Sequence, residues 1–434
     1  MVNGTGTTDG DVNGLGNLII GYNEKRVSGE NVRTGSHNLV IGMANNYSSY
    51  GGLVVRYHNT IDRDYSTVTA GSYNTASSSY ARVSGGYYNT ANGQFASVSG
   101  GGYNIASGGG SFVLGGGNGM IDTLGNTALA PYSSILGGNM NIAGDPNSSY
   151  PYDGQCSTVS GGTNNKASGA YASVSGGSYN TASGYASSVS GGGGPQDGDA
   201  NFAFANYSSI LGGTNNLTGD TREKPEEGQA STVCGGVNNK SYGKYSSVSG
   251  GRNNKASGES SSISGGESGE AHGVVTSING GWDNKAYAEH SSILGGKNST
   301  CSAEGEHVGS ATIAGGADNV TRGLYATVSG GKNNTASGEG SSVCGGRYNL
   351  ASNNYSSVLG GGGWDERMGN TADGGYSTIS GGWGNTASGN YSTVSGGAEN
   401  VAEGGASTVS GGSNRSVNGG GDGGLEGFFR ITRN

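Results

Sequence analysis

The chain has 434 residues and a net charge of −9, and 93 of its residues are glycine while only 5 are proline. Apolar residues are too scarce for large globular cores, and the sequence has no basic stripe, which argues against nucleic acid as a partner. It also has no apolar run long enough to span a bilayer and no recognisable signal peptide, so we expect no membrane insertion.

Residues 1–60 are predicted to form an N-terminal capping region made of degenerate coils. Leu18, Leu39 and Leu53 mark its units, which are 21 and then 14 residues apart and are rich in bulky aliphatic residues. Heavier units at one end of a repeat array suit a role in protecting the open edge of the sheet.

The same region contains a candidate metal site. Asp9, Asp11 and Asn13 alternate in the phrase Asp-Gly-Asp-Val-Asn-Gly, as oxygen ligands do in the first half of a calcium loop. Ile20 stands where the closing bidentate glutamate of such a loop belongs. Calcium is therefore a candidate cofactor, and a polar, flexible segment without any metal is the alternative; no other cofactor is expected.

Residues 61–417 are organised by a valine or isoleucine that returns every fifteen residues, as at Val68, Val83 and Val98. Each occurrence lies in a Ser/Ala-Ser/Thr-Val-Ser-Gly-Gly phrase that is usually followed by Asn-x-Ala. Fixed self-similarity of this kind indicates stacked structural units. The glycine-dense segments lack a 3.6-residue period, which excludes helix.

One repeat predicts two short strands and two corners. Ala172 and Val174 share one face of a strand, and Ser173 and Ser175 share the other. Asn165-Lys166-Ala167 repeats this alternation. The fold class is therefore all-β, a parallel β-solenoid or β-roll of 24 coils. Each coil buries so little apolar surface that we expect several copies to associate side by side, most simply as a homotrimer.

Six insertions of five to nine residues lengthen individual coils. The residue after the repeat valine is usually serine, but it is leucine before five of these long coils, at Leu114, Leu136, Leu211, Leu294 and Leu359. An outward leucine on a solvated strand needs a cover. We expect each insertion to fold back over its own leucine.

Aromatic residues are the candidate ligand-binding groups. We assign five of them to the insertions, where recognition usually resides on a regular scaffold: Tyr150, Tyr152, Phe202, Phe204 and Trp364. Together with nearby carboxylates they suit a surface glycan or a cell-surface receptor, and simple packing onto the scaffold is the alternative. A second tyrosine column, three residues before the repeat valine, is expected to pack at a corner.

No arrangement of residues predicts an enzyme. The five histidines are dispersed, and the glycine-rich phrases lack the following helix and the Gly-Lys-Ser/Thr sequence of a phosphate cradle. Cys234 and Cys344 occupy the outward serine position, so they are interpreted as serine replacements. Residues 418–434 form a Gly-rich tail whose Phe428, Phe429 and Ile431 suggest either a second cap or a docking peptide.

From about residue 15 to residue 417 the chain resembles the head repeats of trimeric autotransporter adhesins, the YadA-like head. The phrases Leu39-Val40-Ile41-Gly42 and Ser173-Val174-Ser175-Gly176 fill the places of that family's Ser-Val-Ala-Ile-Gly unit. The resemblance implies a left-handed β-roll of three chains and a role in attachment. The doubled glycine and the Asn-x-Ala phrase depart from the family pattern.

These features predict a non-enzymatic fibrous protein outside the cell, on a cell surface or on a phage-like particle, that attaches to glycans or cells. Two alternatives stay open. One is a structural filament subunit without a ligand, and the other is an ice-binding solenoid that uses its outward Ser and Thr ladders.

Overall fold

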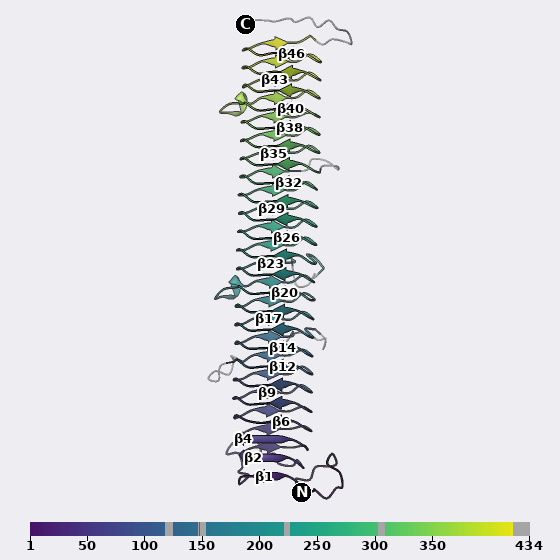
Figure 1. The fold of residues 1–434 in the computed structure, drawn as a ribbon, viewed down its shortest axis with the longest axis vertical. Helices are drawn as coiled ribbons and strands as arrows, with labels where there is room; N and C mark the ends of the chain where they lie inside the picture. The colour runs from purple at the N-terminus through teal and green to yellow at the C-terminus, as the bar shows by residue number, and fades with distance from the viewer. Residues whose placement is uncertain (118–124, 146, 148–152, 221–225, 303–308, 420–434) are drawn as a thin grey trace. The chain divides into compact units, whose positions relative to one another are not determined.

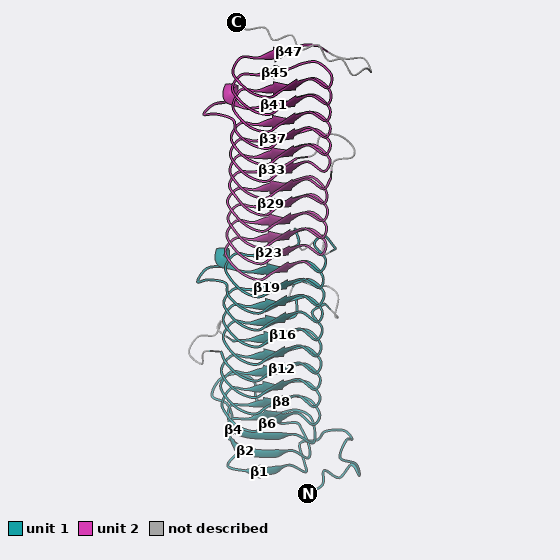
Figure 2. Cartoon of the chain, turned by 45° about the horizontal axis from the view of Figure 1, so that its top comes forward, with its two compact units in different colours: residues 1–230 teal, residues 231–434 magenta. Residues whose placement is uncertain are grey.

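The protein is described by a computed structural model, which covers residues 1–117, 125–145, 147, 153–220, 226–302 and 309–419 (Figure 1). It divides into two compact units, Met1–Ala230 and Ser231–Asn434 (Figure 2). Within each unit, short parallel strands alternate between two sheets, so each unit is a parallel β-solenoid. We call the sheet that holds the repeat valines the valine sheet and the sheet that holds the Asn-x-Ala alanines the alanine sheet.

Unit 1 contributes twelve strands to the valine sheet, and these are β1 (Leu18–Ile20), β2 (Leu39–Met43), β4 (Leu53–Tyr57), β6 (Thr67–Val68), β8 (Arg82–Val83), β10 (Ser97–Val98), β12 (Phe112–Val113), β14 (Ser134–Ile135), β16 (Thr158–Val159), β18 (Ser173–Val174), β20 (Ser188–Val189) and β22 (Ser209–Ile210). Its alanine sheet holds β3 (Asn46–Tyr47), β5 (Thr60–Ile61), β7 (Thr75–Ala76), β9 (Thr90–Ala91), β11 (Ile105–Ala106), β13 (Thr127–Ala128), β15 (Ile142–Ala143), β17 (Lys166–Ala167), β19 (Thr181–Ala182), β21 (Phe202–Ala203) and β23 (Leu217–Thr218). A 3-10 turn, η1 (Asp197–Asp199), lies in one insertion.

Unit 2 also contributes twelve strands to its valine sheet, and these are β24 (Thr232–Val233), β26 (Ser247–Val248), β28 (Ser262–Ile263), β30 (Ser277–Ile278), β32 (Ser292–Ile293), β34 (Thr312–Ile313), β36 (Thr327–Val328), β38 (Ser342–Val343), β40 (Ser357–Val358), β42 (Thr378–Ile379), β44 (Thr393–Val394) and β46 (Thr408–Val409). Its alanine sheet holds β25 (Lys240–Ser241), β27 (Lys255–Ala256), β29 (Glu270–Ala271), β31 (Lys285–Ala286), β33 (Thr300–Cys301), β35 (Val320–Thr321), β37 (Thr335–Ala336), β39 (Leu350–Ala351), β41 (Thr371–Ala372), β43 (Thr386–Ala387), β45 (Val401–Ala402) and β47 (Ser416–Val417). A second 3-10 turn is η2 (Glu366–Met368).

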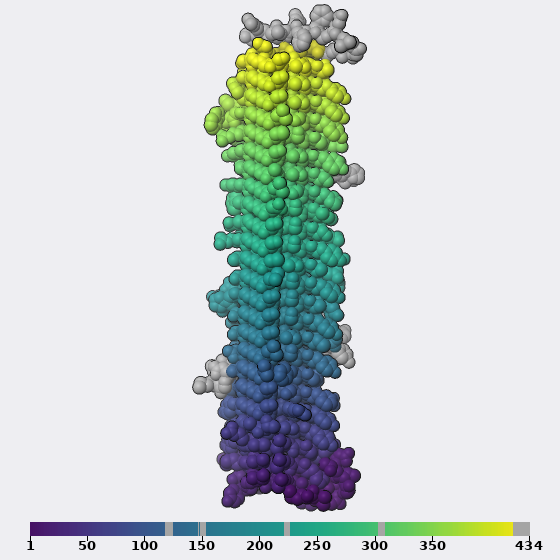
Figure 3. Space-filling view, viewed as in Figure 1, coloured from purple at the N-terminus to yellow at the C-terminus, as the bar shows by residue number. Residues whose placement is uncertain are grey.

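The two units confirm the predicted number of coils and the predicted repeat length. Twelve valine-sheet strands in each unit correspond to 24 turns, and successive repeats pair in register, as in Ser173↔Ser188 and Val174↔Val189. In the space-filling view, the turns of each unit form regularly spaced layers (Figure 3). Parallel pairing of identical repeats places identical side chains above one another, so each repeat position becomes a column along the unit.

We number the fifteen positions of a regular turn from Ser157, at position 1, to Tyr171, at position 15. Position 3 is the repeat valine or isoleucine, and positions 1, 3, 9 and 11 point inward. In this turn Ser157, Val159, Asn165 and Ala167 are all fully buried, as the predicted alternation requires. The interior therefore consists of one aliphatic column and three columns of small or polar residues.

The structure corrects the register that the sequence predicts for the N-terminal strands by one residue. Strand β1 pairs Ile19 with Val40, and β4 pairs Val54 with Val68, so the inward column runs through Ile19, Val40 and Val54 rather than through the leucines. Val40 and Val54 are buried. Three bulky aliphatic residues in a row give no alternation from which to choose the inward one, and the pairing with Val68 decides it.

A buried asparagine column at position 9 was not predicted, and it joins each turn to the next. The Asn180 backbone N–H donates to the Asn165 side-chain oxygen at 3.0 Å. Its own Nδ2 donates to the carbonyl of Gly176 at 2.9 Å and to that of Gly192, in the following turn, at 3.0 Å. Each such amide bonds three backbone groups at the corner, and one of them, the carbonyl of the following turn, also accepts from a backbone N–H, as Gly192 does from Ser178 at 3.1 Å.

The two glycines of each Gly-Gly pair have different roles. The second, at position 6, has a positive φ, such as 92° at Gly281, and a Cβ there would clash with the carbonyl oxygen of Gly296 in the next turn. The first, at position 5, has no positive φ in most turns, although Gly396 and Gly411 have φ of 150° and 140°, and a Cβ added at Gly280 or Gly295 would meet no heavy atom within 4 Å. In turns such as these two, only the second glycine is required within the chain.

Both corners also hold left-handed residues that carry side chains. Position 8 is mostly asparagine, aspartate or tyrosine, and position 15 is often tyrosine, with φ of 56° at Asn164 and 59° at Tyr171. Asparagine tolerates this conformation well, whereas tyrosine does not favour it. No helix in the part of the chain that the structure describes has the length and apolar character needed to cross a bilayer.

Candidate functional site

The insertions occur at both corners of the turn, and this placement determines which columns they adjoin. Those after Val113, Val189 and Val358 lengthen the corner between positions 6 and 9, and the other three lengthen the corner after position 11. Position 4, where the outward leucines stand, lies on the valine sheet between these corners. The loops and the leucines therefore occupy different parts of the turn.

The expectation that each insertion covers its leucine is wrong. The five leucines are 46–53% exposed, and Leu359 is 50% exposed although its insertion, residues 362–369, is fully described. The physical reason is that the insertion departs from the turn at a corner, beyond the glycine pair. It therefore does not pass over the valine sheet, where the leucine lies. Each unit thus presents half-exposed leucines in an otherwise serine-rich outward column.

The predicted ligand-binding aromatics do not form one site. Tyr150 and Tyr152 lie outside the described residues, as do Phe428, Phe429 and Ile431 of the C-terminal cluster. Phe202 and Phe204 belong to the regular turn at β21 and not to an insertion, and their rings stack on each other with centroids 5.4 Å apart. Their outward places at positions 10 and 12 follow from Asn201 at position 9.

Trp364 is the predicted residue that lies in an insertion and is open to solvent. Its side chain is 81% exposed, and the guanidinium of Arg347 lies 5.1 Å from its ring centroid. The short turn η2 holds this loop in shape, because the Asp365 carboxylate accepts a 3.0 Å hydrogen bond from the Arg367 backbone N–H. The arrangement presents a fixed aromatic face next to a cation.

Asn13, one of the three candidate calcium ligands, is hydrogen-bonded within the chain. Asp9 and Asp11 are exposed. The Asn13 side chain donates to the Asn3 carbonyl at 2.8 Å and accepts from the Leu15 backbone N–H at 3.1 Å. Among the described residues no group of three or more His, Cys, Asp or Glu side chains could hold a metal ion.

Tyrosines form stacked columns at the two corners of unit 1. At position 15 the rings of Tyr65 and Tyr80 lie 5.1 Å apart, and at position 8 the rings of Tyr73 and Tyr88 lie 4.7 Å apart, nearly parallel in both cases. A hydrogen bond with Tyr57 is the main cause that raises the pKa of Tyr73 to about 12. The columns agree with the corner packing expected from the sequence, yet they stay partly open to solvent.

A cluster that the sequence did not single out lies on the position-7 corner of unit 2. All three tryptophans of the chain and four cations project from this corner, and we call the set the tryptophan–cation column: Arg252, Trp282, Lys297, Lys332, Arg347, Trp364 and Trp383. The Lys297 ammonium lies 4.6 Å from the Trp282 ring centroid. Fifteen-residue spacings from Arg252 reach Trp282 and Lys297, and a count restarted at Ala317, after the insertion, reaches Lys332 and Arg347.

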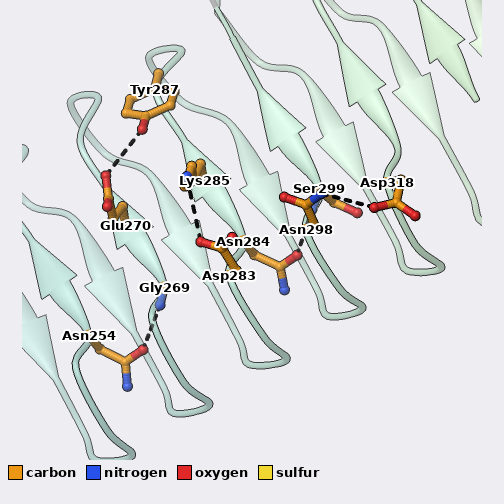
Figure 4. Close-up of polar contacts among 10 residues, drawn as sticks. All are labelled: Asn254, Gly269, Glu270, Asp283, Asn284, Lys285, Tyr287, Asn298, Ser299 and Asp318. Carbon is orange, nitrogen blue, oxygen red and sulfur yellow. Dashed lines mark hydrogen bonds and ion pairs between the residues drawn. The ribbon is translucent and has the colours of Figure 1, made fainter. Parts of the chain in front are cut away.

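Acidic residues next to this column are engaged with other partners (Figure 4). Asp283 pairs with Lys285 at 3.5 Å, and Asp318 accepts a hydrogen bond from the Asn298 amide at 2.9 Å. On the far side of the same turns, Tyr287 donates to Glu270 at 3.1 Å. Burial, followed by the charge of Glu270, raises the pKa of Tyr287.

Two shallow hollows mark the surface of unit 2. One runs along the tryptophan–cation column and is lined by Val237, Arg252, Glu267 and Trp282 over the glycines of position 6. The other lies beside the insertion of residues 362–369 and is lined by polar groups that include Tyr348 and Glu366. Both are open surfaces, which suit contact with an extended ligand better than enclosure of a small one.

No model of a known protein family matches the sequence, and no curated protein matches it either.

Proposed function

We propose that the protein is a non-enzymatic attachment fibre, located outside the cell on a cell surface or a phage-like particle, that binds surface glycans through aromatic side chains on its corners. The observation that carries this proposal is the exposure of large aromatic rings on one corner of unit 2, with Trp364 at 81% and Trp383 at 40%. Exposed apolar groups that gather on one surface indicate a binding role more than scattered ones do.

We further propose that copies of the chain associate side by side, most simply as a homotrimer. Support comes from the valine-sheet side of the turn, where position-4 leucines such as Leu294 and Leu359 are half exposed. The adjacent position-5 glycines have open space where a Cβ would lie, although Ala70 shows that a side chain is tolerated there. Close approach of a second backbone would explain both features.

The two parts of the proposal have separate tests. Binding of the purified chain to an array of neutral and charged glycans tests attachment, and failure to retain any glycan would remove that part. Sedimentation equilibrium tests association, because Leu359→Ser should shift a trimer toward monomer. Leu350→Ser, which changes an outward leucine of the alanine sheet, is the matched control and should leave the mass unchanged. A monomeric wild-type chain would refute association.

A further inference from the structure

The tryptophan–cation column of unit 2 contains two like charges that lie side by side. Lys332 and Arg347 stand in neighbouring turns as direct bridge partners, and both are exposed. Neither forms an ion pair with any described residue, and like charges placed directly opposite each other are destabilising. The chain carries −9 overall, yet position 7 of unit 2 holds four cations and the single carboxylate of Glu267, while Asp283, Asp318 and Glu399 follow at position 8.

Aromatic faces are interleaved with these cations. Trp282 and Trp383 are 45% and 40% exposed, and Trp364 is 81% exposed. Lys297 lies over the ring of Trp282, and Arg347 lies over that of Trp364. A flat apolar face next to a cation matches a sugar ring that carries an acidic group, because the ring stacks on the indole while the acid pairs with the cation.

The spacing of the column also fits a polymer. Successive turns are about 4.8 Å apart, close to the length of one pyranose ring along a polysaccharide chain. Each turn offers at most one cation, and Ala317 separates Lys297 from Lys332. A ligand with no more than one charge per ring matches this density, whereas a densely sulfated polymer carries more charge than the column offers.

We propose that this corner of unit 2 binds an anionic polysaccharide of the uronic acid type along the tryptophan–cation column. The inference rests on the proposed attachment function and names its ligand class. The chain of sugars lies over the groove lined by Val237, Arg252, Glu267 and Trp282, continues past Lys332 and Arg347, and reaches Trp364.

The test measures binding of the intact chain to immobilised polymers at low and moderate salt. Polygalacturonate is expected to bind, with an affinity that falls as salt rises. Equal or tighter binding of polyphosphate or dextran sulfate would show that charge alone acts and would overturn the assignment. Binding of neutral dextran alone would overturn it while leaving attachment to glycans in place, and binding of no polymer would overturn both proposals.

Two variants locate the site. Lys332→Glu combined with Arg347→Glu should weaken polygalacturonate binding by roughly tenfold or more, and Trp282→Ala should weaken it by roughly fivefold. The matched control is Lys240→Glu combined with Lys255→Glu, which makes the same charge change on the alanine sheet of unit 2 and should leave binding nearly unchanged. Equal losses in both double variants would refute this location, and circular dichroism checks that each variant is folded.

Discussion

Removal of one amide from the asparagine column should open the fold locally at the adjoining turns. In unit 2, the Asn334 side chain donates to Gly330 at 2.8 Å and to Gly346 at 3.1 Å, and it accepts from the Asn349 backbone N–H at 3.0 Å. Asn334→Ala deletes all three bonds and leaves the Gly330 carbonyl and the Asn349 N–H without partners, while the Gly346 carbonyl keeps its 2.9 Å bond from the Lys332 N–H. At about 1 kcal/mol net for each bond, the loss is about 3 kcal/mol, or roughly a 100-fold change in the local opening equilibrium.

Hydrogen exchange measured by mass spectrometry reads this change directly, because protection reports local opening. Peptides that cover residues 330–349 should exchange roughly 100-fold faster in Asn334→Ala than in the wild type. Ser329→Ala alters an exposed outward residue of the same turn and should change exchange by less than about twofold. If Asn334→Ala behaved like Ser329→Ala, the asparagine column would not stabilise the turns.

Three further outcomes follow from particular residues. Ser299 occupies position 9 without an amide, so Ser299→Asn should repair the column and raise the free energy of unfolding by about 1–3 kcal/mol, as measured by chemical denaturation. Removal of the hydroxyl that bonds Tyr73 in Tyr57→Phe should lower the pKa of Tyr73 from about 12, as followed by phenolate absorbance; an unchanged value would exclude this hydrogen bond as the cause. Burial raises the pKa of Cys301 to about 11, so at pH 8 a thiol reagent should label the exposed Cys234 but reach Cys301 only after unfolding.

The sequence allowed prediction of the fold because the repeat constrains each inward position many times. Val174 and Ala172 could be placed inside from alternation alone, and the number of turns followed from spacing. The N-terminal units escaped this reasoning, since Leu18-Ile19-Ile20 offers three apolar residues where one must face inward. The register there depends on how β4 pairs with its neighbouring strand, and the local sequence does not show this tertiary contact.

The candidate site was less accessible to sequence reasoning for a physical reason. Exposed positions tolerate almost any residue, so a local pattern does not separate recognition from solvation. Trp364 could be named because its insertion interrupts the repeat. Lys332 and Arg347 share a repeat position, but each looks like an ordinary charged surface residue until the fold places Arg347 beside Trp364. The asparagine column had a visible signal in the repeated Asn-x-Ala phrase, but its role depends on corner carbonyls that only the fold brings within reach.

The inward positions and the corner positions of a turn have different roles, which explains how a thin core coexists with a variable surface. The inward columns are nearly uniform, and where Gly269 or Ser299 interrupts the asparagine column, the backbone N–H at that position still donates to the preceding amide (Figure 4). Position 7, by contrast, ranges from Val237 and Glu267 to Trp282 without any change in strand pairing, because its side chain contributes little to the interior. Hydrogen bonds and glycine geometry therefore fix the winding, while the corner side chains are free to determine what each turn contacts. A solenoid built in this way can acquire a binding surface one turn at a time at little cost in stability, which suits the protein to binding an extended ligand.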